Sequence, residues 1–523
     1  MSDSKRVLLM TNSEYGQANV HLAVAHALLQ QDDHVEVHIA SFRPLRKSVL
    51  GISDLACRDA PGARPIAFHE LPGATMFDAL VRPRFNYFEK ARKPLNFWTT
   101  LQNTKIICHV ACGPWDADES VRIFRRTLEI IAEVEPDIIA IDNFLAPSLS
   151  ACQHFRLRYL VLSPNTLKDF SLMFQPNMPF LWRFPAFATG YPFPLPWHLI
   201  PANMFFNLLY VMIFLSVFSF DVRTRKIKKA LYDQFGAKRT SCFSLFRDPP
   251  DSVQILCANR IEIEMQPLEL PPHVIPCGPI LCPSPPVVAV DPGLFEWLSQ
   301  GPTVMINLGT HVRWSEALTI EMTSALRYLL DRVSNDPSLS KLQILWKLKP
   351  DPDQDFDVAP GSKIYEKLEK EINQGRVKIE SWLKATPYSI LETGQIILSI
   401  NHAGASSFYE CLWFGVPQVL LPQWFDCYDF AERAEFLGIG VHGCRKSQPH
   451  WTSGELGPKL ELALRGSKAI EMRKKAAELV SLCKGNEKGT GRDVAARHIL
   501  SKIKTGEKRQ SIVREEGSIV DRQ

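Results

Sequence analysis

The stretch INHAGASSFYECLWFGVPQVLLPQWFDCYDFAERAEFLGIG, from Ile400 to Gly440, decides the fold. A strand-like run, QIILSIN, ends at the small-residue turn HAGASS, and helical spacing begins near Ser407. Small residues let a ligand approach the backbone, and the N–H groups at a helix start point at that ligand. His402 and Ser406 add side-chain donors at the same place. The stretch therefore predicts a strand-turn-helix unit that binds a diphosphate.

Strands and helices alternate along the rest of the chain. In the N-terminal half we expect strands at about 6–12, 34–42, 137–142 and 159–164, with helices between them, the first from about Asn19 to Gln31. After a proline-rich segment the alternation restarts, with strands at about 303–310, 342–349, 376–382 and 395–401. Such alternation predicts parallel sheets with helical crossovers, so the fold class is α/β. With 523 residues, the chain is long enough for two domains.

The predicted boundaries follow from this restart and from composition. We expect an N-terminal domain, a proline-rich linker, a C-terminal domain and a polar, disordered tail, at 1–280, 281–292, 293–505 and 506–523. Ligands of open α/β sheets bind at the carboxyl ends of the strands, which predicts a cleft between two facing Rossmann-like domains.

The spacing from His402 to Cys427 resembles, without a gap, the donor-binding signature of family 1 UDP-glycosyltransferases, enzymes of the two-domain GT-B fold. The resemblance implies a hexosyltransferase that moves a sugar from a UDP-sugar, with inversion and without a metal or other cofactor. It also implies that 1–280 is the acceptor-binding domain and 293–505 the UDP-sugar-binding, or donor, domain. The expected acceptor is a hydroxyl or similar group of a hydrophobic small molecule, such as a natural product, a sterol or a lipid. A non-catalytic UDP-sugar-binding partner or activator subunit is the alternative.

The same resemblance implies roles for the turn. His402 with Gly404, Ser406 and Ser407 would hold the diphosphate. Glu410, on the first turn of the following helix, would accept hydrogen bonds from the ribose hydroxyls. An acid at this position is also favoured by the helix dipole alone.

Four further residues complete the expected donor site. Trp382 in ESWLKATPYSIL looks like the tryptophan that stacks on uracil in the family. Thr310, at the end of TVMINLGT, resembles the serine or threonine near the phosphate. Asp426 falls where the family has an acid that binds sugar hydroxyls. Cys427 replaces the family's commonest residue, a glutamine that contacts the sugar, so we do not assume that the sugar is glucose.

The stretch SEYGQANVH, which follows the first strand, raises the question of the catalytic base. The family places a histidine there, oriented by an aspartate, and the alignment puts Gln17 at the histidine and Asp142 at the aspartate. Three interpretations stay open. The base is displaced to His21, which shares a helix face with Gln17, or Asp142 acts alone on an acidic acceptor, or the chain binds UDP-sugar without turnover.

An apolar segment between about 170 and 220 falls where the acceptor would bind. It begins as a proline- and aromatic-rich loop and ends in Met204–Phe220, MFFNLLYVMIFLSVFSF. This run is near the lower length limit for a bilayer span. A buried or substrate-lining helix is the preferred interpretation, a helix lying in a membrane surface is the second, and a true span is the third.

Composition excludes other classes of function. A net charge of +4 gives no reason to expect a nucleic-acid partner. Twelve cysteines without a C-x-x-C pair, and no secretory signal, predict free thiols in a cytoplasmic chain, with membrane association left open. The acidic run DPDQDFD is interpreted as a solvated loop, so no metal site is expected.

Overall fold

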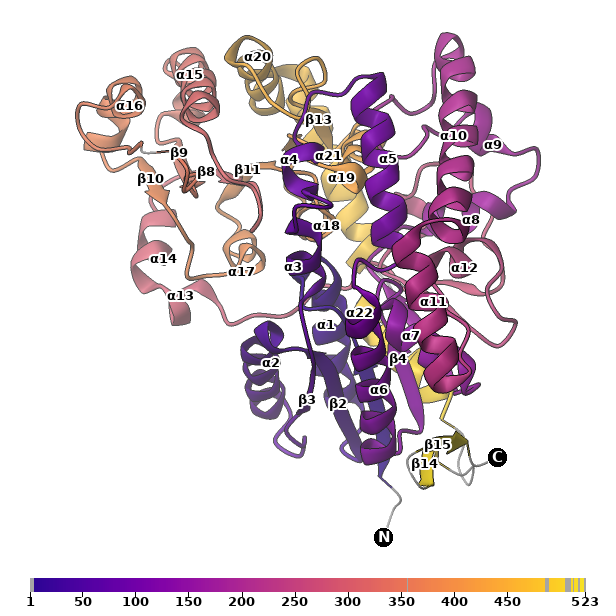
Figure 1. The fold of residues 1–523 in the computed structure, drawn as a ribbon. Coiled ribbons are helices and arrows are strands. Elements are labelled where there is room, and N and C mark those ends of the chain that lie inside the picture. The colour runs from indigo at the N-terminus through magenta and orange to yellow at the C-terminus, as the bar shows by residue number, and fades with distance from the viewer. Residues whose placement is uncertain are drawn as a thin grey trace.

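The computed structural model describes residues 4–354, 356–484, 489–503, 509–510, 512–515 and 518–521. Within these residues the chain forms two parallel β-sheets and a short antiparallel strand pair near its C-terminus. Helices cover both faces of each parallel sheet (Figure 1). The predicted two-domain α/β architecture is confirmed.

The N-terminal sheet has the strand order β3-β2-β1-β4-β5-β6-β7. Along β1, Leu8 and Met10 pack into the core on one face of the sheet, whereas Val7 and Leu9 pack into the core on the other. The strands are β1 (Lys5–Met10), β2 (Val35–Phe42), β3 (Ala67–Leu71), β4 (Ile138–Ile141), β5 (Tyr159–Ser163), β6 (Ile255–Cys257) and β7 (Val274–Pro276).

Helices of this half form the crossovers and an additional layer beside the cleft. The long helix α10 contacts both α5 and α9 in that layer. The helices are α1 (Tyr15–Gln31), α2 (Arg46–Asp59), α3 (Met76–Val81), α4 (Tyr87–Ala91), α5 (Phe97–Ala111), α6 (Ala117–Val134), α7 (Ala146–His154), α8 (Leu167–Ser171), α9 (Pro179–Trp182), α10 (Ile200–Ser219), α11 (Val222–Phe235) and α12 (Cys242–Arg247).

The C-terminal sheet has the order β10-β9-β8-β11-β12-β13. Its register places Asn307 of β8 opposite Lys347 of β9 and Asn401 of β11, so the ends of these strands form one edge. The strands are β8 (Thr303–Asn307), β9 (Gln343–Lys347), β10 (Val377–Glu380), β11 (Ile396–Asn401), β12 (Gln418–Leu420) and β13 (Gly440–His442).

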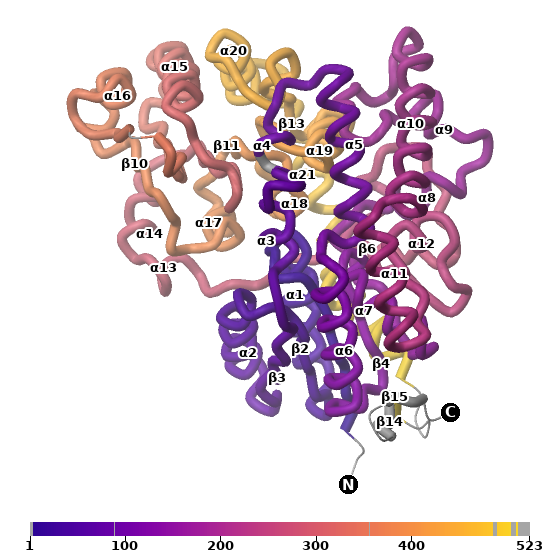
Figure 2. The backbone as a smooth tube through the Cα atoms, viewed as in Figure 1, coloured from indigo at the N-terminus to yellow at the C-terminus, as the bar shows by residue number. Residues whose placement is uncertain are grey.

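The helices of the C-terminal half flank this sheet, and the connection before α13 runs between the two halves (Figure 2). They are α13 (Val287–Val290), α14 (Pro292–Leu298), α15 (Glu316–Val333), α16 (Lys363–Asn373), α17 (Pro387–Glu392), α18 (Ala405–Trp413), α19 (Phe425–Phe436), α20 (Ser453–Leu464) and α21 (Gly466–Lys484).

The last helix, α22 (Gly491–Ser501), returns to the N-terminal half and packs against α1 (Figure 1). Its Ala495, Ala496 and Ile499 are part of the core that α1 forms with the N-terminal sheet. The predicted C-terminal domain, 293–505, therefore ends in a helix that packs on the N-terminal half and connects the two halves.

Much of the tail 506–523, predicted to be disordered, lies outside the described residues. Where the structure describes it, β14 (Ile512–Glu515) and β15 (Ser518–Asp521) pair antiparallel. Gln510 is buried and its side chain donates hydrogen bonds to the carbonyl oxygens of Pro136 and Arg158. These described parts differ from the predicted disorder.

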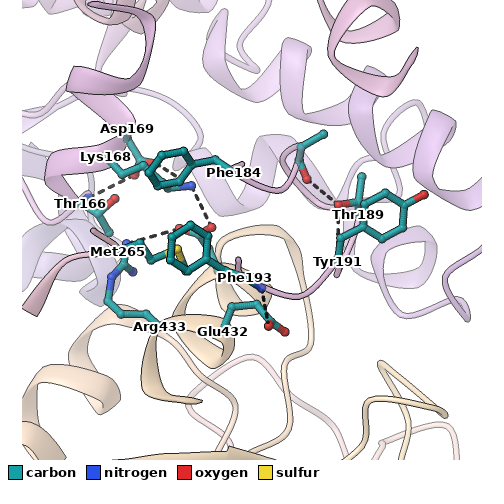
Figure 3. Close-up of polar contacts among 12 residues, drawn as sticks. Thr166, Lys168, Asp169, Phe184, Thr189, Tyr191, Phe193, Met265, Glu432 and Arg433 are labelled. Carbon is teal, nitrogen blue, oxygen red and sulfur yellow. Dashed lines mark hydrogen bonds and ion pairs between the residues drawn. The ribbon is translucent and has the colours of Figure 1, made fainter. Parts of the chain in front are cut away.

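A buried polar network joins the halves beside the cleft (Figure 3). Arg433 of α19 lies against Glu264 of the N-terminal half, and Lys168 of α8 donates to Asp429 of α19, with 2.8 Å between Nζ and Oδ1. The backbone N–H of Phe193 donates to Glu432 at 3.2 Å. These contacts fix α19, which carries part of the expected donor site, against the N-terminal half.

Candidate active site

A cleft of about 1270 Å³ lies between the two halves. Its lining includes residues that lie within four positions after the ends of strands of both sheets: Glu14, Phe144 and Pro164 from the N-terminal sheet, and Gly309 and His402 from the C-terminal sheet. The carboxyl ends of both sets of parallel strands therefore face one cavity, as expected for a ligand site in α/β folds.

His402 follows β11 and its ring is held between two glycines. A Cβ atom at Gly309 would lie 2.8 Å from the His402 ring, and one at Gly404 would lie 2.4 Å from it. Gly309 also has φ +80°, a backbone conformation that glycine adopts without strain. His402 Nδ1 is buried and has no hydrogen-bond partner among the described residues. Burial, with the nearby His311 and Lys347, lowers the pKa of His402 to about 3, so the ring is neutral.

The turn after His402 leads into α18. Gly404 is the N-cap residue of that helix, and Gly404, Ser406, Ser407 and Glu410 all line the cleft. The structure thus brings together every residue predicted for the turn. Burial raises the pKa of Glu410 to about 8, so this carboxyl carries little negative charge at neutral pH before a ligand binds.

Lys347 is a cation in this half of the cleft that the sequence reasoning did not identify. It ends β9, lines the cleft and donates from Nζ to the Gly309 carbonyl at 3.1 Å. Its Nζ also lies 3.8 Å from the ring centroid of Trp382, a cleft residue that is 51% exposed. Burial and Lys349 lower the pKa of Lys347 to about 8.

The other predicted donor residues divide into two groups. Thr310 and Asp426 line the cleft, and burial raises the pKa of Asp426 to about 7. Cys427, in contrast, is fully buried and packs in a core cluster with Phe408 and Phe430. Its thiol faces the protein interior, so the structure does not bring it to the position of a sugar contact.

In the N-terminal half, Gln17 lines the cleft but His21 does not reach it. His21 is completely buried, and its Nδ1 lies 3.3 Å from the Gln17 carbonyl oxygen of the same helix. Burial lowers the pKa of His21 to about 4. The role of His21 as the base stays a prediction. Its buried position away from the cleft does not favour that role.

Asp142 is also completely buried. One carboxylate oxygen accepts from the backbone N–H and side-chain amide of Asn12, at 3.1 and 2.9 Å. The other accepts from the Phe144 backbone N–H at 2.8 Å. Asp142 thus holds the ends of β1 and β4 together, and its catalytic role likewise stays a prediction.

Glu14 is an acidic residue of the N-terminal half that does line the cleft, and the sequence reasoning missed it. Helix α1 begins at Tyr15 rather than near Asn19, so Gly16 and Gln17 lie in its first turn and Glu14 is the N-cap residue. The Ser-Glu pair that immediately follows the predicted strand at 6–12 was the signal that could have identified it.

Comparison with known proteins identifies the family. No family model matches the chain. The chain is 31% identical over 452 residues to glycosyltransferase sdnJ of Sordaria araneosa, and the match covers 84% of each protein. The chain belongs to the UDP-glycosyltransferase family. A UDP-glycosyltransferase of Talaromyces amestolkiae is 27% identical over 205 residues, which cover 38% of this chain and 37% of that protein.

Solved structures agree with this assignment at the level of the fold. A UDP-glucosyltransferase from Polygonum tinctorium superposes with a TM-score of 0.60 at 15% identity, covering 96% of this chain and 99% of that one. This UDP-glycosyltransferase therefore has the GT-B fold, and it is an enzyme of a family that takes its sugar from a UDP-sugar. The alternative of a non-catalytic partner is not favoured.

Proposed function

We propose that the protein transfers a hexose from a UDP-sugar to a hydroxyl or similar group of a hydrophobic small molecule, with inversion and without a metal ion. The observation that carries the proposal is the composition of the cleft, which joins a polar half suited to a nucleotide diphosphate with an apolar half suited to a lipophilic acceptor.

The polar half supplies donors and positive charge for UDP. The N-terminus of α18, the hydroxyls of Thr310 and Ser406 and the ammonium of Lys347 line one wall. Preorganised donors of this kind stabilise the negative charge that develops on a departing diphosphate. In this proposal Trp382 stacks on uracil, Glu410 binds the ribose and Asp426 binds sugar hydroxyls.

The apolar half accounts for the acceptor class. Its wall is formed by aliphatic and aromatic side chains from several helices and a loop of the N-terminal half, among them Ile52, Leu80, Ile107, Val110, Leu172, Phe180, Phe187, Phe206, Tyr210, Phe214, Phe243 and Phe246. Burying a lipophilic molecule against such a surface yields about 25 cal/mol per Å² of apolar area. Inversion is proposed because the acceptor wall and the phosphate wall belong to opposite halves, an arrangement that suits in-line displacement.

UDP release tests this proposal directly. UDP-glucose, UDP-galactose and UDP-N-acetylglucosamine are each incubated with a panel of sterols, phenols and polyketide alcohols, with and without EDTA. We expect turnover that EDTA does not reduce, and NMR of the product should show a β-linked sugar from the α-linked donor. UDP binding without turnover across the panel would favour the non-catalytic alternative, and an α-linked product would contradict inversion.

We further propose that α10 rests on a membrane surface. Among the described residues, one segment, Trp197–Ser219, is long and apolar enough to be a candidate span, and only 17% of its most apolar window is buried. The outward face exposes apolar side chains of α10 and of the adjoining start of α5: Phe97, Trp98, Met204, Phe205, Leu208 and Met212. Arg225 and Lys226 of the following helix are exposed, which suits anionic lipid headgroups.

The opposite face of α10 supports the choice of a lipid surface over another partner. Phe206, Tyr210 and Phe214 of this helix line the cleft. The helix therefore contacts the acceptor half on one side and exposes apolar side chains on the other. A membrane-bound acceptor would then have a short path into the cleft.

A further inference from the structure

Glu14 occupies a helix N-cap position without capping the helix. Its backbone is extended, with φ −69° and ψ 127°, and its side chain makes no cap hydrogen bond. Instead, Oε1 accepts from the backbone N–H of Phe77, at the start of α3, at 2.7 Å. This contact turns the carboxylate to the wall of the cleft, where Glu14 is a lining residue.

The contact with Phe77 places Glu14 next to the expected phosphate loop. The Phe77 ring stacks on His311 of the C-terminal half, with ring centroids 4.4 Å apart and 20° between the planes. His311 directly follows Thr310. The carboxylate is therefore near the place where the acceptor wall and the phosphate wall meet.

Two acceptor atoms at this place have no donor in the part of the chain that the structure describes. Glu14 Oε2 and Gln17 Oε1 are both buried and have no hydrogen-bond partner among the described residues. The two residues are three apart in the chain, at the start of α1, and both line the cleft. An unsatisfied buried acceptor costs about 1–3 kcal/mol, so such a pair calls for a ligand that donates a hydrogen bond. A hydroxyl group is such a ligand.

We propose that Glu14 is the catalytic base of the reaction, in place of the family's histidine, and that Gln17 orients the acceptor. This assignment rests on the proposed function. The acceptor hydroxyl gives its proton to Glu14 Oε2 while its oxygen forms a bond to the anomeric carbon. The bond from that carbon to the β-phosphate oxygen breaks, and its electron pair leaves with UDP.

The charges around Glu14 suit this role. Burial is the main cause that raises the pKa of Glu14 to about 7, and the nearby Asp142 and Asp78 add to it. A carboxylate with this pKa is a stronger base than an ordinary one and is still largely ionised slightly above neutral pH. His311, which faces it across Phe77, is neutral because burial lowers its pKa to about 4. The rate is therefore expected to rise with pH through about 7 and then level.

Turnover of Glu14→Gln tests the assignment. The amide of this variant keeps an oxygen that accepts from Phe77 but cannot take a proton, so UDP affinity, measured by calorimetry, should be unchanged and thermal stability should not fall. With UDP-glucose and ergosterol, we expect kcat to fall about 100-fold or more. With 4-nitrophenol, which ionises near neutral pH without help, the loss should be below about 10-fold. Glu14→Asp should restore part of the rate and keep the rise with pH.

Glu70→Gln is the matched control, because it makes the same change at an exposed position on β3. It should match the wild type with both acceptors. An equal loss of rate with both acceptors in Glu14→Gln, or a rate within about threefold of wild type, would overturn the role of Glu14 while leaving the proposed function intact. Absence of turnover by the wild type with every donor and acceptor would overturn the proposed function and this assignment together.

Discussion

Arg433 of α19 donates from Nε to Glu264 at 3.0 Å, and both side chains are completely buried between the two halves. Glu264 also accepts from the backbone N–H of Lys168 at 3.1 Å and from the Asn259 side chain at 2.9 Å. Arg433 thus neutralises a carboxylate that fixes the C-terminal half to the N-terminal half.

Replacing Arg433 should therefore weaken the whole molecule. Arg433→Ala leaves Glu264 buried without its counter-charge, and breaking such a pair costs about 3–5 kcal/mol. We expect a clear fall in Tm, measured by calorimetry. Lys229→Ala removes an exposed ion pair with Asp233 and is the control. A Tm of Arg433→Ala equal to that of the control would contradict the structural role.

Lys347 should contribute to UDP affinity through the diphosphate. Charge-assisted hydrogen bonds contribute about 1.5–3 kcal/mol, so Lys347→Met should weaken UDP binding by about 10-fold or more in titration calorimetry. Uridine lacks the phosphates, and its binding should change little. Lys341→Met, at an exposed position just before β9, is the matched control. Equal losses for UDP and uridine would place Lys347 outside the phosphate site.

Glu410 should make the stability of the ligand-free protein depend on pH. Burial raises its pKa from 4.5 to about 8, so between these values the folded state holds more protons than the unfolded state. The contribution of Glu410 to the free energy of unfolding is therefore fully present below about pH 4.5 and is lost as the pH rises through about 8. Glu410→Gln should be more stable than wild type at about pH 8 and differ little at about pH 5, as measured by Tm. The opposite sign would contradict the buried, uncharged state of this carboxyl.

The proposed membrane surface is tested by cosedimentation with vesicles of phosphatidylcholine and phosphatidylserine. Leu208→Glu with Met212→Glu should reduce binding at least about 10-fold, because charged groups enter the apolar interface at high cost. Turnover of a water-soluble phenol should stay unchanged. Ile470→Glu, at an apolar residue on α21 that is 63% exposed, should bind vesicles like wild type. Equal binding by all variants would exclude α10 as the contact.

The fold could be predicted from the sequence because its signals are local. Each buried parallel strand is an apolar run, and the restart after the proline-rich linker shows that the arrangement occurs twice. The turn from His402 to Ser407 could also be predicted, because its small residues are a local signal. The structure explains them: the His402 ring packs between Gly309 and Gly404, where a side chain would not fit.

The rest of the site depended on contacts that are distant in the chain. The position of the Glu14 carboxylate depends on its hydrogen bond with Phe77, which lies 63 residues away. It also depends on a helix that begins earlier than its apolar spacing indicates. Lys347 is one polar residue at the end of an apolar strand. It belongs to the site because β8 and then β11 end at the same edge of the sheet. Cys427 follows Asp426 directly, but the helix turns its thiol into the core.

A structure of the protein with UDP and an acceptor tests the central claim most directly. The distance to measure joins the acceptor hydroxyl oxygen and Glu14 Oε2. We predict about 2.6–3.2 Å, with the acceptor body against the aromatic wall and UDP against α18. A hydroxyl beyond hydrogen-bonding reach of Glu14, or one held by another ionisable group, would contradict the account.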